Sequence, residues 1–322
     1  MDRRRVVGIG LGALAGAAYG TGPLFFKAWV FPAGVGWIAM LMWRFMFATA
    51  VSWAWLAFQP RARAALRDLG RRTVARLLLT GAFFIVNASV YYAAIEKIDI
   101  SLVALLMSVY PALVAVLSLR LGYRFQGRLA WGSLAIVLLG TVLTVGGVNA
   151  STDQGGIVLA LLSPVAYAVY IVLTAWMAGE RPGQTADMRS RGNGAEVPPA
   201  VAGAVMMTGT WMATIVVALV TGTPVLPSDV PTAAWPGLAG IGIFAAAIAI
   251  QAFYASAARI GAAQASLMAT VEPIVVIFLG ITFLNEVFSP IRGVGAAVVL
   301  IGVLLAQFAT PSESRRVVLE EP

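Results

Sequence analysis

Long apolar runs alternate with short polar connections along nearly the whole 322-residue chain. Each run is close to the ~20 residues that an α-helix needs to cross a bilayer. The pattern predicts an all-α polytopic membrane protein with ten transmembrane helices. The expected spans are approximately residues 6–26, 34–58, 74–95, 100–119, 129–147, 155–177, 200–221, 236–258, 263–285 and 291–308.

The composition agrees with a membrane location and narrows the chemistry. Hydrophobic residues make up 60% of the chain and charged residues 11%, whereas soluble domains carry about 25% charged residues. There is no Cys and no His, and neither Lys27 nor Lys97 follows a glycine-rich turn that could bind ATP. We therefore expect no cofactor, no bound metal and no enzymatic activity.

The basic residues gather on one side of the predicted membrane. Of the 22 Lys and Arg residues, 18 fall in segments on that side, three (Lys27, Lys97 and Arg292) fall on the other, and Arg44 alone lies within a span. Because cytoplasmic loops are rich in Lys and Arg, both termini are expected in the cytoplasm, with the chain in the cell (inner or plasma) membrane. Orientation and contact with lipid headgroups account for the charge, so no nucleic-acid partner is expected.

Two internal matches indicate a duplication of the chain. Residues 92–143 match residues 254–305 at an offset of 162, and residues 8–19 match residues 156–167 at an offset of 148. The N-terminus resembles a signal peptide, but its match to an internal helix predicts that it is retained. Chance similarity between Ala/Leu/Val-rich helices is the alternative explanation.

Five spans per copy is an odd number, so the second copy enters the membrane in the opposite orientation. Inverted repeats of this kind build many secondary transporters, with the substrate site between the halves. The expected organisation is a first five-helix repeat in residues 1–148, a second in residues 149–310 and a cytoplasmic tail in residues 311–322.

Two charged residues within spans are the leading functional candidates, since charges in the membrane are costly. Arg44 lies about ten residues, roughly 15 Å, from the outer end of its span. It could bind a substrate carboxylate, pair with Glu272 or hold helix-end carbonyls. Glu272 could carry a proton, partner Arg44 or act in a gate.

Other candidates for a cavity or gate share helix faces or repeat positions. Pro273 and its counterpart Pro111 each remove a backbone hydrogen bond and are expected to break or kink their helices. Polar and aromatic side chains suited to a small amphipathic ligand are Asn87, Tyr91, Tyr92, Tyr110, Gln251 and Tyr254. Each of these also has packing as a simpler explanation.

The chain resembles the EamA branch of the drug/metabolite transporter superfamily. The resemblance rests on Glu272-Pro273, on Phe-Leu-Asn-Glu at 283–286 and on the glycine-containing run at 295–305. In the first half it rests on Pro111, Leu121-Gly122, Gly140 and the Trp-Arg-Phe at 43–45.

The resemblance implies a 5+5 inverted repeat around a central cavity and export of amino acids, other metabolites or drugs, although importers occur. The family often ends each Pro-containing helix with Gly-Glu. Here Glu286 follows Asn285 in the second copy, and the first copy has Tyr123-Arg124 instead. Glu286 is therefore carried over as a motif residue without a first-half equivalent.

These observations predict a secondary-active transporter that works by alternating access and exports amino acids or similar small metabolites or drugs. Its expected partners are a small-molecule substrate and the lipid bilayer, with no obligate partner chain. The alternatives are a membrane-embedded enzyme acting on lipid-linked substrates and a passive channel.

Overall fold

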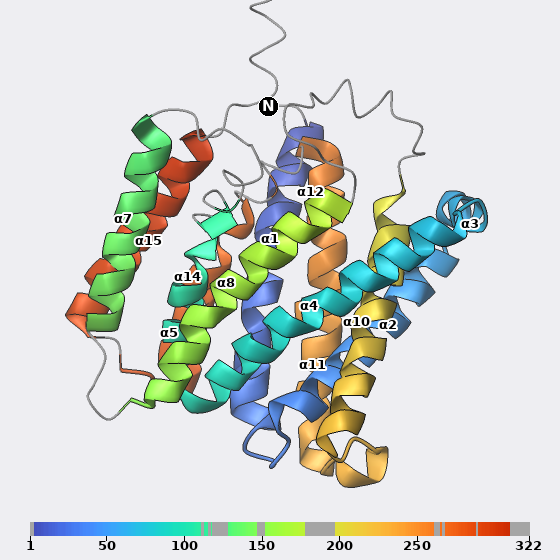
Figure 1. Cartoon of the computed structure of the whole chain (residues 1–322), viewed down its shortest axis with the longest axis horizontal. Helices are drawn as coiled ribbons and strands as arrows, with labels where there is room; N and C mark the ends of the chain where they lie inside the picture. Colours follow the sequence, from blue (N-terminus) through green and yellow to red (C-terminus); the bar gives the residue numbers. More distant parts are fainter. Residues whose placement is uncertain are drawn as a thin grey trace, which may run out of the picture. The chain divides into compact units, whose positions relative to one another are not determined.

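A computed structural model describes residues 3–110, 113–114, 117, 128–146, 152–177, 197–260, 265, 268–287 and 289–309 (Figure 1). The regular elements within these ranges are all helical. They are α1 (Arg3–Phe25), η1 (Phe26–Val30), α2 (Trp37–Ala57), α3 (Pro60–Arg67), α4 (Arg71–Lys97), α5 (Ile100–Met107), α7 (Arg128–Gly146), α8 (Gln154–Met177), α10 (Pro199–Thr221), η2 (Pro227–Asp229), η3 (Thr232–Ala234), α11 (Trp235–Gly242), η4 (Ile243–Ile248), α12 (Ala249–Ile260), α14 (Glu272–Leu284) and α15 (Pro290–Ala309).

Six helical segments in the described part of the chain are long and apolar enough to cross a membrane. They are Arg5–Val30, Trp37–Ala57, Arg71–Lys97, Gln154–Leu173, Ala200–Thr221 and Thr232–Phe253. Shorter apolar helices cover Trp131–Thr144, Glu272–Leu284 and Pro290–Gly302. The prediction of an all-helical, multi-pass membrane protein is confirmed at this level.

The fourth and ninth predicted spans are interrupted at matching places. A turn at residues 108–109 follows α5, and helical conformation resumes at Tyr110. A turn at residues 270–271 precedes α14, which begins at Glu272. Adding the repeat offset of 162 to the first break gives the second, so each of the two matched sequences carries a discontinuous helix.

Two glycine contacts also correspond between the matched sequences. A Cβ atom at Gly8 would overlap Ile260 and lie against the Cβ of Arg259. At Gly156, the counterpart of Gly8, a Cβ would overlap Ile98 and the Cβ of Lys97. Ile98 and Lys97 are themselves the counterparts of Ile260 and Arg259 at the offset of 162, so chance similarity does not explain the pairing.

The chain divides into two compact units, which are described separately. Unit 1 comprises Met1–Ala104, Ser151–Ser163 and Val197–Val287, and unit 2 comprises Leu105–Ala150, Pro164–Glu196 and Phe288–Pro322. In unit 1, α1 packs along α12 and α14, and α10 packs against α2 and α4. In unit 2, α7 packs along α15, and a Cβ at Gly140 would overlap the backbone of Val299.

The crossing of α4 and α10 depends on two glycines. A Cβ at Gly81 would overlap the carbonyl of Met206, and a Cβ at Gly209 would overlap the carbonyl of Leu78. The hydroxyl of Thr210 donates a 2.8 Å hydrogen bond to the Gly81 carbonyl. Small residues let helix backbones approach closely in membranes, so this contact is one of the tightest in unit 1.

The short helix α3 was not predicted, because its sequence reads as an arginine-rich connection. Pro60 occupies its first turn, where a missing N–H costs nothing. Ala62 is buried in a cluster with Leu56 and Val201, while the arginines of α3 are exposed. In Figure 1, α3 is seen end-on near one end of α4, whereas α4 is seen along its length. This orientation is expected for a short helix that lies along the membrane surface.

Candidate functional site

Arg44 lies on α2, seven residues after the helix begins at Trp37. The helix starts later than the predicted span, so Arg44 is about 10 Å, and not 15 Å, from the end of the span that was predicted to be the outer one. Its side chain is half-buried and is held by unit 1 on several sides. One hydrogen bond runs from Nη1 to the hydroxyl of Tyr92 and another, of 3.4 Å, from Nη2 to the Ala245 carbonyl.

Aromatic rings surround the Arg44 guanidinium. Its central carbon lies 5.1 Å from the ring centroid of Tyr92 and 5.4 Å from that of Phe45. The Tyr92 ring in turn contacts Tyr91 at 5.3 Å and Phe26 at 5.5 Å between centroids. Cation–π contacts of this kind favour a charged guanidinium away from bulk water.

The Ala245 carbonyl that receives Arg44 belongs to η4, a π-helical segment. A π-helix departs from the regular i to i−4 hydrogen-bond ladder, and such segments occur often at functional sites. A second π-helical segment, η1, lies at the end of α1 and contains Phe26. Hydropathy predicts apolar length but not this local geometry, so neither segment was anticipated.

Glu272 and Arg44 belong to one electrostatic group without forming a direct pair. The charges of Arg44 and Glu272 act on each other and on the hydroxyls of Tyr91 and Tyr92. Arg44 and Glu272 do not come within the 4.0 Å of an ion pair, whereas Lys97 and Asp153, elsewhere in unit 1, do so at 3.7 Å. Two opposite charges thus share a half-buried region of unit 1 without neutralising each other in a direct pair.

One buried nitrogen of Arg44 could donate a further hydrogen bond. Its Nε has no hydrogen-bond partner among the described residues, and neither does Nε2 of Gln251. Buried polar atoms are nearly always satisfied in folded proteins. An unsatisfied donor on an arginine that also binds aromatic and carbonyl groups is therefore compatible with a site for a polar ligand or ordered water. We call Arg44, Tyr91, Tyr92 and Glu272 the Arg44 group.

The remaining predicted residues lie in several places. Asn87 is buried on α4, and its side-chain oxygen accepts a 3.3 Å hydrogen bond from Ser163. Tyr254 is on α12, but its side chain lies outside the described part, as does Pro111. Pro273 is the second residue of α14, where it costs no helical hydrogen bond.

Tyr110 belongs to unit 2 and takes part in a separate aromatic cluster. Its ring meets that of Tyr167 edge-on at 4.8 Å between centroids, and Tyr167 stacks on Tyr170 at 5.9 Å. The sequence grouped Tyr110 with the other tyrosines as one set of cavity candidates. The structure describes two groups, one in each unit.

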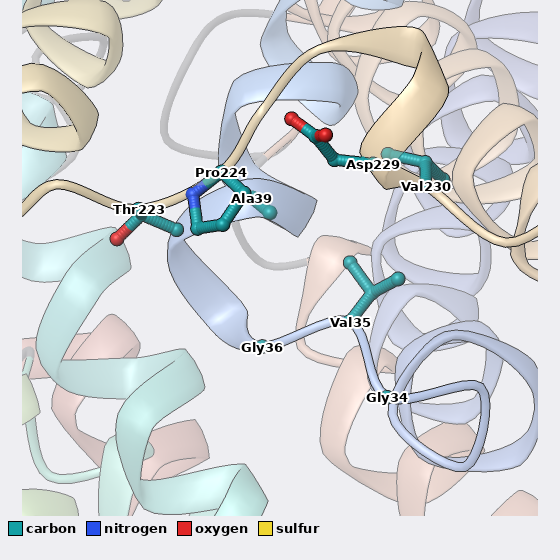
Figure 2. A pocket seen from close by; sticks show the side chains of 8 residues that line it. All are labelled: Gly34, Val35, Gly36, Ala39, Thr223, Pro224, Asp229 and Val230. Carbon is teal, nitrogen blue, oxygen red and sulfur yellow. The ribbon is translucent and has the colours of Figure 1, made fainter.

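A small cavity of about 120 Å³ lies away from the Arg44 group (Figure 2). It is formed by the connection before α2 and the connection after α10. Its lining residues are Gly34, Val35, Gly36, Ala39, Thr223, Pro224, Asp229 and Val230. None of the predicted cavity residues contributes to it.

Charged residues near the ends of helices form a network that sequence reasoning missed. Glu286 accepts hydrogen bonds from the backbone N–H groups of Ile100 (2.6 Å) and Ser101 (3.1 Å) and from the Ser101 hydroxyl. It thus caps α5 from a position after α14. The backbone is shaped for this contact by Asn285, which adopts a left-handed conformation at φ 53°.

The contacts of Lys27, Glu96 and Asp153 complete this network. Lys27 donates to the carbonyls of Ile95 (2.6 Å), Glu96 (3.1 Å) and Ile98 (3.4 Å) at the end of α4. Glu96 accepts a 2.5 Å hydrogen bond from the N–H of Trp37 at the start of α2. Asp153 accepts from Gly156 N–H at 2.6 Å and pairs with Lys97. We call Lys27, Glu96, Lys97, Asp153 and Glu286 the outer-end network, because the distribution of basic residues predicts that this side is the outer one.

Burial raises the pKa of the Glu286 carboxyl above its usual range. The hydrogen bonds from Ser101 and Ile100 lower it in part, and the nearby charge of Asp99 raises it further. A clue was present in the sequence, since the side predicted to be the outer one has few basic residues, and several of its charged residues adjoin predicted helix ends. Contacts up to 186 residues apart could not be derived from it.

The residue pattern of the EamA-like transporter family matches residues 6–146 and 154–308, which together span nearly the whole chain. The chain belongs to the EamA-like transporter family. This EamA chain is thus a multi-pass membrane protein of the drug/metabolite transporter type, as the residue resemblance predicted.

Comparison with individual proteins adds information on the fold only. A crystal structure of a chain 17% identical to this EamA chain superposes with a TM-score of 0.63, over 94% of this chain and 97% of the other. No curated protein matches this EamA chain significantly. Within the described residues no group of three or more His, Cys, Asp or Glu residues is arranged to hold a metal ion.

Proposed function

We propose that this EamA chain is a secondary-active transporter that works by alternating access. It exports amino acids or similar small metabolites or drugs across the cell membrane, with both termini in the cytoplasm. Its ten helices form two inverted five-helix repeats, in residues 1–148 and 149–310. The matching helix breaks before Tyr110 and Glu272 support the repeat, because discontinuous helices build substrate sites in inverted-repeat transporters.

The observation that carries the proposal is the Arg44 group. An arginine and a glutamate share one region of a membrane protein without forming an ion pair, and two tyrosine rings accompany them. A charge within a span is retained where it meets protein, water or substrate. Arg44 therefore binds the substrate carboxylate, for which its planar fork of donors is suited.

Glu272 has two compatible roles. It receives the ammonium group of an amino acid during binding, and it exchanges a proton when that group is absent. The start of α14 suits a changing charge, because the helix dipole at Glu272 stabilises the ionised form while burial opposes it. Asn87, Gln251 and Tyr254 complete the proposed site, and Pro273 and Pro111 give the broken helices freedom to move.

Counterflow into proteoliposomes tests the function directly. Proteoliposomes that contain the purified protein are loaded with one unlabelled compound at a time from a panel of amino acids, sugars and cationic drugs. Uptake of the same compound in labelled form is then followed with and without a pH gradient. Saturable accumulation for one class, accelerated by the gradient, is expected. Chemical alteration of a compound would favour an enzyme, and ohmic single-channel currents would favour a channel.

A further inference from the structure

The outer-end network joins helix ends that are far apart in the sequence. Lys27 binds carbonyls 68 to 71 residues away, Glu96 binds an N–H 59 residues away, and Glu286 binds N–H groups 185 and 186 residues away. All the residues involved belong to unit 1. On the orientation proposed above, this end of the unit faces away from the cytoplasm.

Most charges in the network have the sign favoured by the helix end that they bind, although Glu96 itself lies in the last turn of α4, where the helix dipole disfavours an acid. The carboxylates of Glu96, Asp153 and Glu286 lie at the starts of α2, α8 and α5, where unpaired N–H groups and the helix dipole attract anions. The ammonium of Lys27 lies at the end of α4, where carbonyls attract cations. The contacts are thus complementary as well as numerous.

The corresponding positions on the cytoplasmic side have a different chemistry. At the offset of 148, Arg5 replaces Asp153, and at 162, Arg259 replaces Lys97. The outer ion pair therefore corresponds to two like charges. At the offset of 162, Arg124 replaces Glu286 and Ala258 replaces Glu96. The acids that hold the outer end have become basic or apolar residues at the cytoplasmic end.

From this difference we infer that the outer-end network is a latch that keeps the transporter closed toward the outside at rest. The cytoplasmic end has no counterpart of these acids at the matched positions, so it opens more readily. Opening outward requires the contacts of Glu286 and Lys27 to break together. This inference rests on the alternating access proposed above and adds which side is closed in the absence of substrate.

Cysteine labelling from each side of the membrane tests the latch. The chain has no cysteine, so Tyr91→Cys introduces a single reporter in the Arg44 group. A membrane-impermeant thiosulfonate is added to intact cells, which expose the outer side, or to inverted vesicles, which expose the cytoplasmic side. The labelling rate is then measured. In this background Glu286→Gln and Lys27→Met are each expected to raise the rate from outside about tenfold, because each removes charge-assisted hydrogen bonds.

A matched control and a reverse variant sharpen the test. Asp229→Asn removes an acid that lies on the same side but bonds only within its own connection, to Leu226, so its labelling rates should not change. Arg5→Asp places an acid opposite Arg259, as Asp153 lies opposite Lys97. It should slow labelling from the cytoplasmic side and raise labelling from outside.

Each outcome decides for or against the latch. Equal outside rates in the reporter protein, Glu286→Gln, Lys27→Met and Arg5→Asp, all of them monodisperse, would overturn it. If Glu286→Gln fails to fold, Lys27→Met and Arg5→Asp decide the question. Labelling needs no substrate, so unchanged rates together with active counterflow would overturn the latch alone. Changed rates without any counterflow by the wild-type protein, which keeps Tyr91, would overturn the transport proposal.

Discussion

The Nη1 atom of Arg44 donates a hydrogen bond to the hydroxyl of Tyr92, which joins α2 to α4 inside unit 1. The same tyrosine ring lies against the guanidinium. Tyr92 thereby holds Arg44 in one orientation, while Glu272 remains outside ion-pair distance. An arginine held by a neutral partner keeps its charge available for a substrate anion.

Replacing Tyr92 with Phe removes the hydroxyl but keeps the ring and its contacts with Phe26 and Tyr91. Arg44 then loses a fixed hydrogen bond, and a hydrogen bond to a charged group is worth roughly 1.5–3 kcal/mol. We expect the half-saturation concentration for carboxylate substrates to rise about tenfold or more, as measured by counterflow. Tyr91→Phe, which leaves the Arg44 bond intact, serves as the matched control. A larger effect of Tyr91→Phe would show that the hydroxyl of Tyr92 does not position Arg44.

Glu272→Gln keeps the shape of the side chain and removes its ability to exchange a proton. Exchange of substrate for substrate should continue, whereas acceleration by an imposed pH gradient should disappear. Both are measured in the same proteoliposomes. The reference variant is Asp229→Asn, whose carboxyl lies outside both the Arg44 group and the outer-end network and which should retain the response to the gradient. A gradient response that persists unchanged in Glu272→Gln would exclude it as the proton carrier.

Gly81→Ala places a methyl group against the carbonyl of Met206 at the crossing of α4 and α10. The backbone there cannot move aside without separating the helices, and overpacking of this kind typically costs about 1–3 kcal/mol. We expect a lower melting temperature in size-exclusion thermostability measurements. Gly10→Ala on α1 is the control, because a Cβ at Gly10 meets no atom within 4 Å. Equal melting temperatures for the two variants would contradict the close crossing.

The raised pKa of Glu286 makes a prediction about pH. A carboxyl whose pKa is higher in the folded protein adds stability below its ordinary pKa of about 4.3, and this contribution is lost as the pH rises through the higher, folded value. We therefore expect the difference in melting temperature between the wild type and Glu286→Gln, taken as wild type minus variant, to fall as the pH is raised above about 4.3. Asp99 and Lys27 act on the same carboxyl and are unchanged in both proteins. Parallel curves across this range would contradict the shift.

The helical membrane architecture follows from the sequence because apolar length is a physical requirement of the bilayer. The doubled pattern also indicated where long helices would be interrupted, since Pro273 lies in the first turn after one break and Pro111 occupies the matched position. Hydropathy is insensitive to hydrogen-bond register, so it could not distinguish the π-helical η1 and η4 from α-helix. It also could not show that α3 forms a helix.

The site was predictable in its charged members and less so in their arrangement. Arg44 and Glu272 are conspicuous because charges within spans are rare, and the structure brings them into one group with Tyr91 and Tyr92. That Tyr92 is the residue bound to Arg44 depends on how α2 and α4 face each other, which no local pattern specifies. The role of Glu286 as a cap of α5 likewise depends on a contact across the fold.

Recognition of a substrate carboxylate by Arg44 can be tested by comparing an acid with its uncharged counterpart. Counterflow is measured for an amino acid identified in the panel and for its amide, which lacks the carboxylate charge, in the wild type and in Arg44→Ala. If Arg44 binds the carboxylate, Arg44→Ala abolishes counterflow of the acid while any transport of the amide is spared. Equal loss of both compounds, with the variant folded and monodisperse, would contradict it.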